Sequence, residues 1–132
     1  MRDFTKIRAW QLADDFAVQV YQLTRSFPRE ELYGLTNQLR RASYSIAANI
    51  VEGASRNSQK DYLHFLYIGR GSLAESQYFL HLAGRLKFAD AASLADVTDQ
   101  GRKTYACLHG LITAMETELA QKTQRQAKQC VP

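Results

Sequence analysis

Six polar side chains recur at spacings of three or four residues between positions 38 and 56. They are Gln38, Arg41, Ser45, Asn49, Glu52 and Arg56. Residues at these spacings share one side of an α-helix, so the six form a polar strip beside an apolar row. Such groups suit either a hydrogen-bonded network that fixes how helices meet or an acid–base pair in a cleft. Because no nucleophile or set of metal ligands accompanies them, the structural interpretation is favoured.

A further carboxylate, Glu75, falls within an apolar arc of a predicted helix. The arc consists of Ile68, Phe79, Leu82 and Leu86. A buried carboxylate without a partner costs several kcal/mol, so we expect Glu75 to meet a cation or several donors. The candidate partners, among which the sequence does not choose, are Arg40, Arg41, Asn49 and Ser72. The predicted structural network comprises Gln38, Ser45, Asn49, Glu52, Ser72 and Glu75, and a hydrophobic replacement of Glu75 should alter folding or assembly.

Residue types that carry catalysis or bind metals are scattered along the chain. The three histidines, His64, His81 and His109, match neither a His-Glu-x-x-His nor a Glu-x-x-His motif. The two cysteines, Cys107 and Cys130, have neither metal-site spacing nor the number needed for a disulfide framework. We therefore expect no catalytic, metal-binding or cofactor-binding residues and no cofactor. A small hydrolase or metal protein is the third and least favoured interpretation.

Basic side chains give a more suggestive pattern. The candidates for phosphate contacts are Arg40, Arg41, Arg56, Lys60 and Arg70. Clustered cations suffice to bind phosphates, and nearby tyrosines such as Tyr44 and Tyr67 can stack on bases or pack at an interface. The alternative for most of these cations is a solvated surface charge. Arg41 also belongs to the polar strip, so the two interpretations compete for it.

The hydrophobic periodicity is helical throughout. It predicts helices over residues 6–27, 35–54, 58–87 and 91–122. Pro28 ends the first of them, Ser58 with Asp61 resembles a capping box, and Asp90 or Ser93 caps the last. Short connections between four long helices predict an all-α, antiparallel up-down four-helix bundle. The bundle domain should span residues 1–122, followed by a polar, basic and disordered tail over 123–132.

The predicted third helix has apolar groups on two sides. Leu63, Tyr67, Ala74 and Tyr78 form an outer row away from the main apolar face. A contiguous exposed apolar row indicates an interface, and in a small bundle the simplest partner is another copy of the chain. Gly69, on the inner side of the same helix, favours close packing of a neighbouring helix.

Length and composition fit a single soluble domain. The chain has 132 residues, of which 45% are hydrophobic and 23% charged, and a net charge of +4. No apolar run approaches the ~20 residues needed to span a bilayer, so we expect no membrane association. The charged start, MRDFTKIRAW, differs from a signal peptide, so the expected location is the cytoplasm.

One stretch resembles a known protein family. The run FPREELYGLTNQLRRASYSIAANIVEGASRNSQKDY, followed by GSLAE in the next helix, resembles the four-helix bundle family associated with intervening sequences of bacterial 23S ribosomal RNA genes. Members often have proline where this chain has Ala47, and alanine where it has Gly69. The first difference should leave the helix straighter, and the second should let a neighbouring helix approach.

The resemblance implies an antiparallel bundle that assembles into a ring-like homopentamer. The chain is also similar to accessory proteins of diversity-generating retroelements, which are basic pentamers that bind nucleic acid and a reverse transcriptase. We therefore expect a non-enzymatic, oligomeric protein that binds RNA or DNA through basic residues. The alternative is a protein-interaction scaffold or accessory subunit that makes no direct contact with nucleic acid. The nucleic-acid target and any protein partner are not encoded in a recognisable form.

Overall fold

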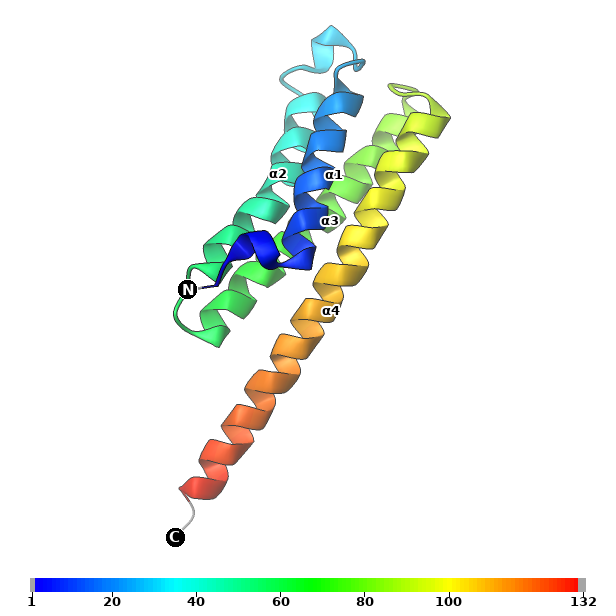
Figure 1. Ribbon diagram of the computed structural model, residues 1–132. Helices are drawn as coiled ribbons and strands as arrows, with labels where there is room; N and C mark the ends of the chain where they lie inside the picture. The colour runs from blue at the N-terminus through cyan, green and yellow to red at the C-terminus, as the bar shows by residue number, and fades with distance from the viewer. Residues whose placement is uncertain (1, 131–132) are drawn as a thin grey trace.

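The computed structural model describes residues 2–130, and within them the chain forms four α-helices and no β-strand (Figure 1). The helices are α1 (Arg8–Thr24), α2 (Leu35–Ala54), α3 (Gln59–Arg85) and α4 (Ala91–Gln129). Two short 3-10 turns, Phe4–Lys6 and Arg29–Glu31, precede α1 and α2. The prediction of an all-α chain with four helices is confirmed.

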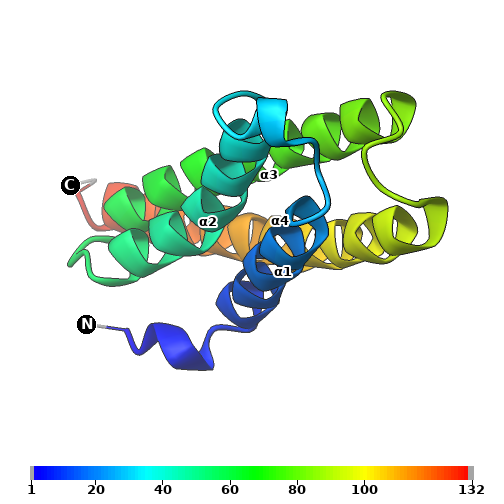
Figure 2. The ribbon, with the colours of Figure 1, turned by 90° about the horizontal axis from the view of Figure 1, so that it is seen from above.

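Consecutive helices run in opposite directions along the bundle (Figure 1). α1 packs against α2 and α4, and α3 packs against the same two helices. Seen from above, the Phe4–Lys6 turn lies on the outside of the bundle, next to the start of α1 (Figure 2). The chain therefore surrounds one core that receives side chains from all four helices.

The core follows from the apolar rows of the sequence. Its fully buried side chains include Phe16, Leu39, Ile46, Ile50, Leu66, Leu73, Leu80, Leu108 and Ile112. Burying each such side chain contributes about 1.5–3 kcal/mol. Two helix starts are fixed by side chains: Ser58 accepts a hydrogen bond from the Asp61 amide, and Asp90 accepts one from the Ser93 amide. These bonds satisfy amides that have no partner within the first helical turn.

The first helix is shorter than the sequence predicted. α1 begins at Arg8 because Asp3 caps a separate turn, and the amide of Thr5 donates to the Asp3 side chain at 3.0 Å. The helix ends at Thr24, where the Ser26 and Phe27 amides turn back to carbonyls three residues earlier. That tightened turn carries Phe27 into the core, where it is buried, before Pro28 redirects the chain.

The last helix is longer than the sequence predicted. α4 continues to Gln129, so residues 123–129 are helical where we expected a disordered tail. The segment contains no glycine, and its Ala, Gln, Lys and Arg residues have high helix propensity. All residues from 120 to 130 are exposed, and the helix extends beyond the other three (Figure 1). Residue 1 and residues 131–132, which the two predicted domains also included, lie outside the described residues.

Gly69 is buried on the side of α3 that packs against α2. A methyl group placed on Gly69 would lie 3.5 Å from the Ile46 carbonyl oxygen and 3.8 Å from the Asn49 Cβ. These are ordinary contact distances, so the two helices pack closely here but would still accommodate a methyl group. Over residues 2–130, none of the helices combines the length and apolar character needed to cross a membrane.

Candidate nucleic-acid interface

The N-terminal segment is fastened to the turn between α2 and α3 by Arg2. Its backbone amide donates to the Ala54 carbonyl at 3.2 Å, and its guanidinium donates to the Arg56 carbonyl at 3.1 Å. The guanidinium carbon also lies 4.2 Å from the centre of the Tyr62 ring, a favourable cation–π distance. Burial raises the pKa of Tyr62, although the nearby Arg2 charge partly opposes this shift. Arg2 is therefore held in place with its charge at the surface.

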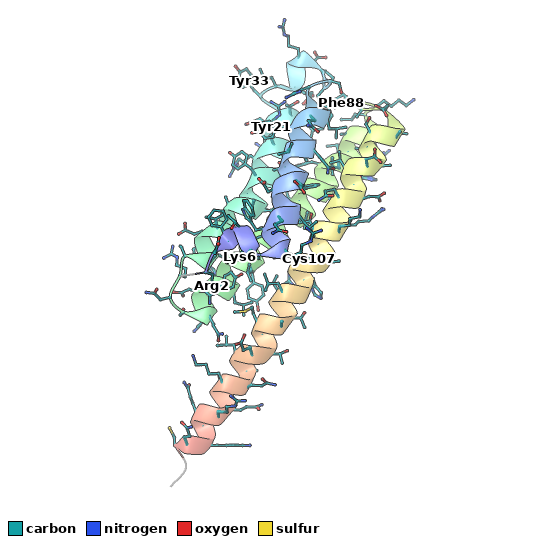
Figure 3. The ribbon with its side chains drawn as sticks, in the orientation of Figure 1. Arg2, Lys6, Tyr21, Tyr33, Phe88 and Cys107 are labelled. Atoms are coloured by element: carbon teal, nitrogen blue, oxygen red, sulfur yellow. The ribbon has the colours of Figure 1, made fainter. Side chains whose placement is uncertain are left out.

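Two further cations lie at the same turn. The Arg56 guanidinium pairs with Glu52 and lies 4.8 Å from the centre of the Phe65 ring. Lys60 is exposed in the first turn of α3. Figure 3 labels Arg2 and Lys6 in the N-terminal segment that leads into α1. We call Arg2, Arg56 and Lys60 the basic end.

The projecting part of α4 adds a row of cations on this side of the bundle. Lys122, Arg125 and Lys128 follow each other at intervals of three residues, and no acidic residue occurs between 119 and 132. The interval keeps the three on one side of the helix, over a length of about 9 Å. This end of α4 points the same way as the turn between α2 and α3 (Figure 1). We call these three residues the basic stripe.

The five basic residues singled out in the sequence do not form one surface. Arg56 and Lys60 come together at the basic end, but Arg40 turns towards α1, where its Nε donates to the Thr24 hydroxyl at 2.7 Å. Arg70 donates to the His109 ring at 3.3 Å, between α3 and α4. Arg41 is exposed on α2, with no hydrogen bond or ion pair to another described residue. Sequence reasoning missed Arg2, whose only signal was a positive charge near the start of the chain.

The predicted polar network exists in a smaller form between α2 and α3. The hydroxyls of Ser45 and Ser72 are hydrogen-bonded at 3.1 Å. The amide nitrogen of Asn49 donates to the Ser45 carbonyl at 2.7 Å and to the Ser45 hydroxyl at 3.0 Å. Gln38 and Glu52 are exposed and stand apart from this cluster. The Ser45–Ser72 hydrogen bond therefore joins the two helices, and Asn49 supports Ser45 from within α2.

The prediction that Glu75 is buried is wrong. Its side chain is exposed and has no hydrogen bond or ion pair within residues 2–130. The reason is that the surrounding arc is itself open: Ile68 and Leu86 are 42% and 49% exposed. A helical wheel shows which residues share a side, but it does not show which sides a single chain covers.

The contrast between half-buried Asn49 and exposed Glu75 gives a direct test of the polar cluster. Asn49→Ala removes two hydrogen bonds in a half-buried position and should lower the free energy of unfolding by about 1–2 kcal/mol. Glu75→Ala, on the neighbouring exposed arc, should change it by less than about 0.5 kcal/mol. Urea unfolding followed by circular dichroism measures both variants, and equal losses would contradict the assignment.

The outer row of α3 is also only partly as predicted. Tyr67, Ala74 and Tyr78 are exposed, but Leu63 is 6% exposed and belongs to the core, so its assignment to an outer interface is wrong. Tyr67 donates a hydrogen bond from its hydroxyl to the Glu116 carboxylate at 2.8 Å. This bond is the main reason that the pKa of Tyr67 is raised. The three exposed residues thus form a largely aromatic surface of α3, and the Tyr67–Glu116 hydrogen bond ties this surface to α4.

The comparisons with known proteins bear on this arrangement. A family model described as 23S rRNA-intervening sequence protein matches residues 5–110. The chain belongs to this family. A crystal structure from the S23 ribosomal protein family, that of a protein of unknown function from Bacteroides thetaiotaomicron, has a TM-score of 0.73 and 23% identity. The match covers 79% of this chain and 97% of that one, and it shows a shared fold. No curated protein matches the chain.

The limits of the family match divide the candidate interface. Arg56, Lys60 and the cluster around Ser45 lie inside the matched residues of the 23S rRNA-intervening sequence protein family. Arg2 and the basic stripe lie outside them. The candidate interface is thus built partly on the family's shared bundle and partly on segments at the two ends of this chain. Among residues 2–130, no three His, Cys, Asp or Glu side chains gather as metal ligands.

Proposed function

We propose that the protein is a non-enzymatic module that binds RNA or another nucleic acid by its phosphates, through the basic end and the basic stripe. The observation that carries the proposal is the hydrogen bond from the Arg2 guanidinium to the Arg56 carbonyl. This bond brings the N-terminal cation to the turn that carries Arg56 and Lys60. The basic stripe, in a segment with no acidic residue from 119 onward, points out from the same end. The family name, which refers to 23S ribosomal RNA, supports the same class of partner.

The geometry favours contact with phosphates over reading of bases. Tyr62 is 2% exposed, and Phe65 is half-buried, so both rings support guanidinium groups and neither offers a free face for stacking. Contacts with phosphates position a nucleic acid but carry no sequence information. The proposed binding is therefore largely independent of sequence.

Assembly would strengthen this binding. We propose that the exposed aromatic groups of α3 are covered by copies of the chain, in the homopentamer that the family resemblance implies. Tyr78 is 58% exposed, and Ile68, on the adjoining arc, is 42% exposed. Five chains with a net charge of +4 each would carry about +20, a field that attracts polyanions. Sedimentation equilibrium measures the number of subunits.

Binding of a generic RNA across a range of salt concentrations tests the function. Each phosphate contact releases condensed counterions, so the logarithm of the binding constant should fall linearly with the logarithm of salt concentration, by about 0.7 per contact for single strands. Fluorescence anisotropy at 50–200 mM salt, about the range over which such binding weakens strongly, gives the slope. An absence of binding at low salt would exclude the proposal.

The exposed aromatic surface also supports a second candidate, a scaffold that docks a protein such as a reverse transcriptase. An apolar interface predicts capture of a partner that is insensitive to salt. Tyr78→Ala should abolish that capture, whereas Lys60→Gln, at the basic end, should leave it unchanged. RNA binding that weakens with Lys60→Gln, without any salt-insensitive capture of a protein, would favour the first candidate.

A further inference from the structure

A small pocket lies at the opposite end of the bundle, where α1 leads into α2. Its volume is about 240 Å³, and it is lined by three arginines and two threonines, with Leu32 among the apolar residues of its wall. The polar lining residues are Arg25, Arg29, Arg40, Thr24 and Thr36. The pocket is separate from the basic end, because Arg40 and Ala54 are fourteen residues apart on α2, or roughly 21 Å.

Thr36 brings an unpaired hydroxyl to this pocket. The residue is 3% exposed, and its Oγ1 is buried without a hydrogen-bond partner. The other threonine differs, because the Thr24 hydroxyl donates to the Val20 carbonyl at 2.8 Å and accepts from Arg40. A buried hydroxyl that lacks a partner costs about 1–3 kcal/mol. In the unliganded chain, none of the described groups accepts the proton of this pocket-lining residue.

The Arg40 guanidinium is already held at the pocket. Its Nε donates to the Thr24 hydroxyl at 2.7 Å, and its central carbon lies 4.7 Å from the centre of the Tyr21 ring. Its two terminal nitrogens donate to no other described residue. The hydrogen bond to Thr24 and the contact with the Tyr21 ring thus fix the Arg40 guanidinium. Its four other N–H donors remain unused. A guanidinium that is positioned in advance loses little entropy when it binds an anion.

The charges around the pocket are unbalanced. In the described part of the chain, none of the three arginines forms an ion pair with a carboxylate. One acidic side chain of the connecting turn, Glu31, accepts a hydrogen bond from the Leu35 amide at 3.0 Å. The neighbouring Glu30 is exposed. The site therefore offers donors and positive charge and has no carboxylate in its lining.

We infer that this pocket binds a phosphate group, held by Arg25, Arg29 and Arg40 and accepting a hydrogen bond from Thr36. Phosphate presents only acceptor oxygens at neutral pH and carries up to about two negative charges, and guanidinium groups bind it in a bidentate manner. The volume is below the roughly 300–1,000 Å³ of pockets for drug-sized ligands, so the phosphate enters with little attached to it. The source is either a small free phosphate or the terminal phosphate of a nucleic acid.

Nuclear magnetic resonance of the full ¹⁵N-labelled chain, titrated with inorganic phosphate at constant ionic strength, tests the site. Saturable shifts are expected at the amides of Arg29, Thr36 and Arg40. Arg29→Gln removes a charge-assisted contact at an exposed position and should weaken binding about tenfold or more. Arg41→Gln is the matched control, because it removes the same charge from the next position on α2 after Arg40 and should leave binding unchanged.

Thr36→Val separates binding from folding. It removes a hydroxyl that lacks a partner in the unliganded chain, so the thermal midpoint without phosphate should stay the same or rise. Phosphate binding should nevertheless weaken severalfold. Failure of phosphate to give saturable shifts, or equal binding by wild type and Arg29→Gln, would overturn the proposal.

Two RNA oligomers of the same sequence distinguish the sources of phosphate. If a 5′-phosphorylated oligomer shifts Thr36 and the 5′-hydroxyl oligomer does not, the ligand is a nucleic-acid end, and this version rests on the proposed function. If inorganic phosphate shifts Thr36 and neither oligomer does, the ligand is a small free phosphate. RNA that shifts only the basic end, with no response of Thr36 to phosphate, refutes the pocket while supporting the proposed function.

Discussion

Gly53→Ala should lower the free energy of unfolding by about 1–3 kcal/mol. Gly53 is buried near the end of α2, where α3 turns back against it. An added methyl would lie 2.9 Å from both the Phe65 Cβ and the Tyr62 Cδ1, and 3.1 Å from the Tyr62 carbonyl oxygen. These atoms belong to the backbone or lie close to it, so they cannot move aside without shifting α3. The cost of this overlap exceeds the gain in helix propensity of about 1 kcal/mol that alanine brings.

Gly69→Ala is the matched control, since it makes the same substitution in the same pair of helices. The nearest atom to its added methyl would be the Ile46 carbonyl oxygen at 3.5 Å, an ordinary contact distance. The variant should therefore gain about 0.5–1 kcal/mol of stability from helix propensity. Urea unfolding monitored by circular dichroism compares the two, and a loss at Gly69 as large as that at Gly53 would refute the argument.

The substitution Gly53→Ala should also perturb the basic end, because it displaces a side chain that contacts Arg2. Tyr62, which an added methyl would displace, supports the Arg2 guanidinium at 4.2 Å. A shift of Tyr62 would also disturb the turn whose Arg56 carbonyl accepts the hydrogen bond from Arg2. Gly53→Ala is thus expected to weaken RNA binding at temperatures where the variant is still folded, while Gly69→Ala leaves that binding intact.

The helices that the sequence predicted well are those with strong local signals. The second helix was predicted with its observed bounds, Leu35–Ala54, because its apolar row is regular and both flanks contain clear breaks. The start of α4 at Ala91 was recognisable from Asp90, whose side chain caps it. The first helix was harder, since a capped 3-10 turn and the tightened turn around Phe27 both depend on tertiary packing.

The errors on α3 have one physical cause. Its inner row, including Leu66, Leu73 and Leu80, is fully buried or nearly so, and the pattern predicted that side correctly. Periodicity could not show how far the core extends around the helix, so Glu75 was placed inside and Leu63 outside. The angle that one helix buries depends on how its neighbours cross it, which a single sequence does not reveal.

The candidate interface was predictable only in part for a similar reason. Arg56 and Lys60 are neighbours in sequence, so their proximity at a turn could be foreseen. Arg2 contacts the Arg56 carbonyl across 54 residues, and no local pattern announces such a contact. Arg40 was predicted to bind phosphate at the nucleic-acid surface, but its hydrogen bond to Thr24 directs it to the pocket at the other end.

Replacing all three residues of the basic stripe, by Lys122→Gln, Arg125→Gln and Lys128→Gln, should weaken RNA binding about tenfold or more at physiological salt. The three side chains are exposed on a helix that extends beyond the bundle, and glutamine has high helix propensity. The free energy of unfolding should therefore change by less than about 0.5 kcal/mol. Fluorescence anisotropy with a generic RNA measures the affinity, and urea unfolding measures the stability.

The dependence on salt separates direct contact from a general loss of charge. Three lost phosphate contacts per chain should reduce the slope of log affinity against log salt by about 2 for single strands and about 3 for duplexes. The control replaces Arg8, Arg85 and Lys103 by glutamine, which removes the same charge from exposed positions of the bundle. It should keep the wild-type slope, because a weaker distant field changes the attraction of RNA without changing how many counterions are released at the contact. If both triple variants lose affinity and slope equally, the extension of α4 makes no contact of its own, and the basic end must bind RNA without it.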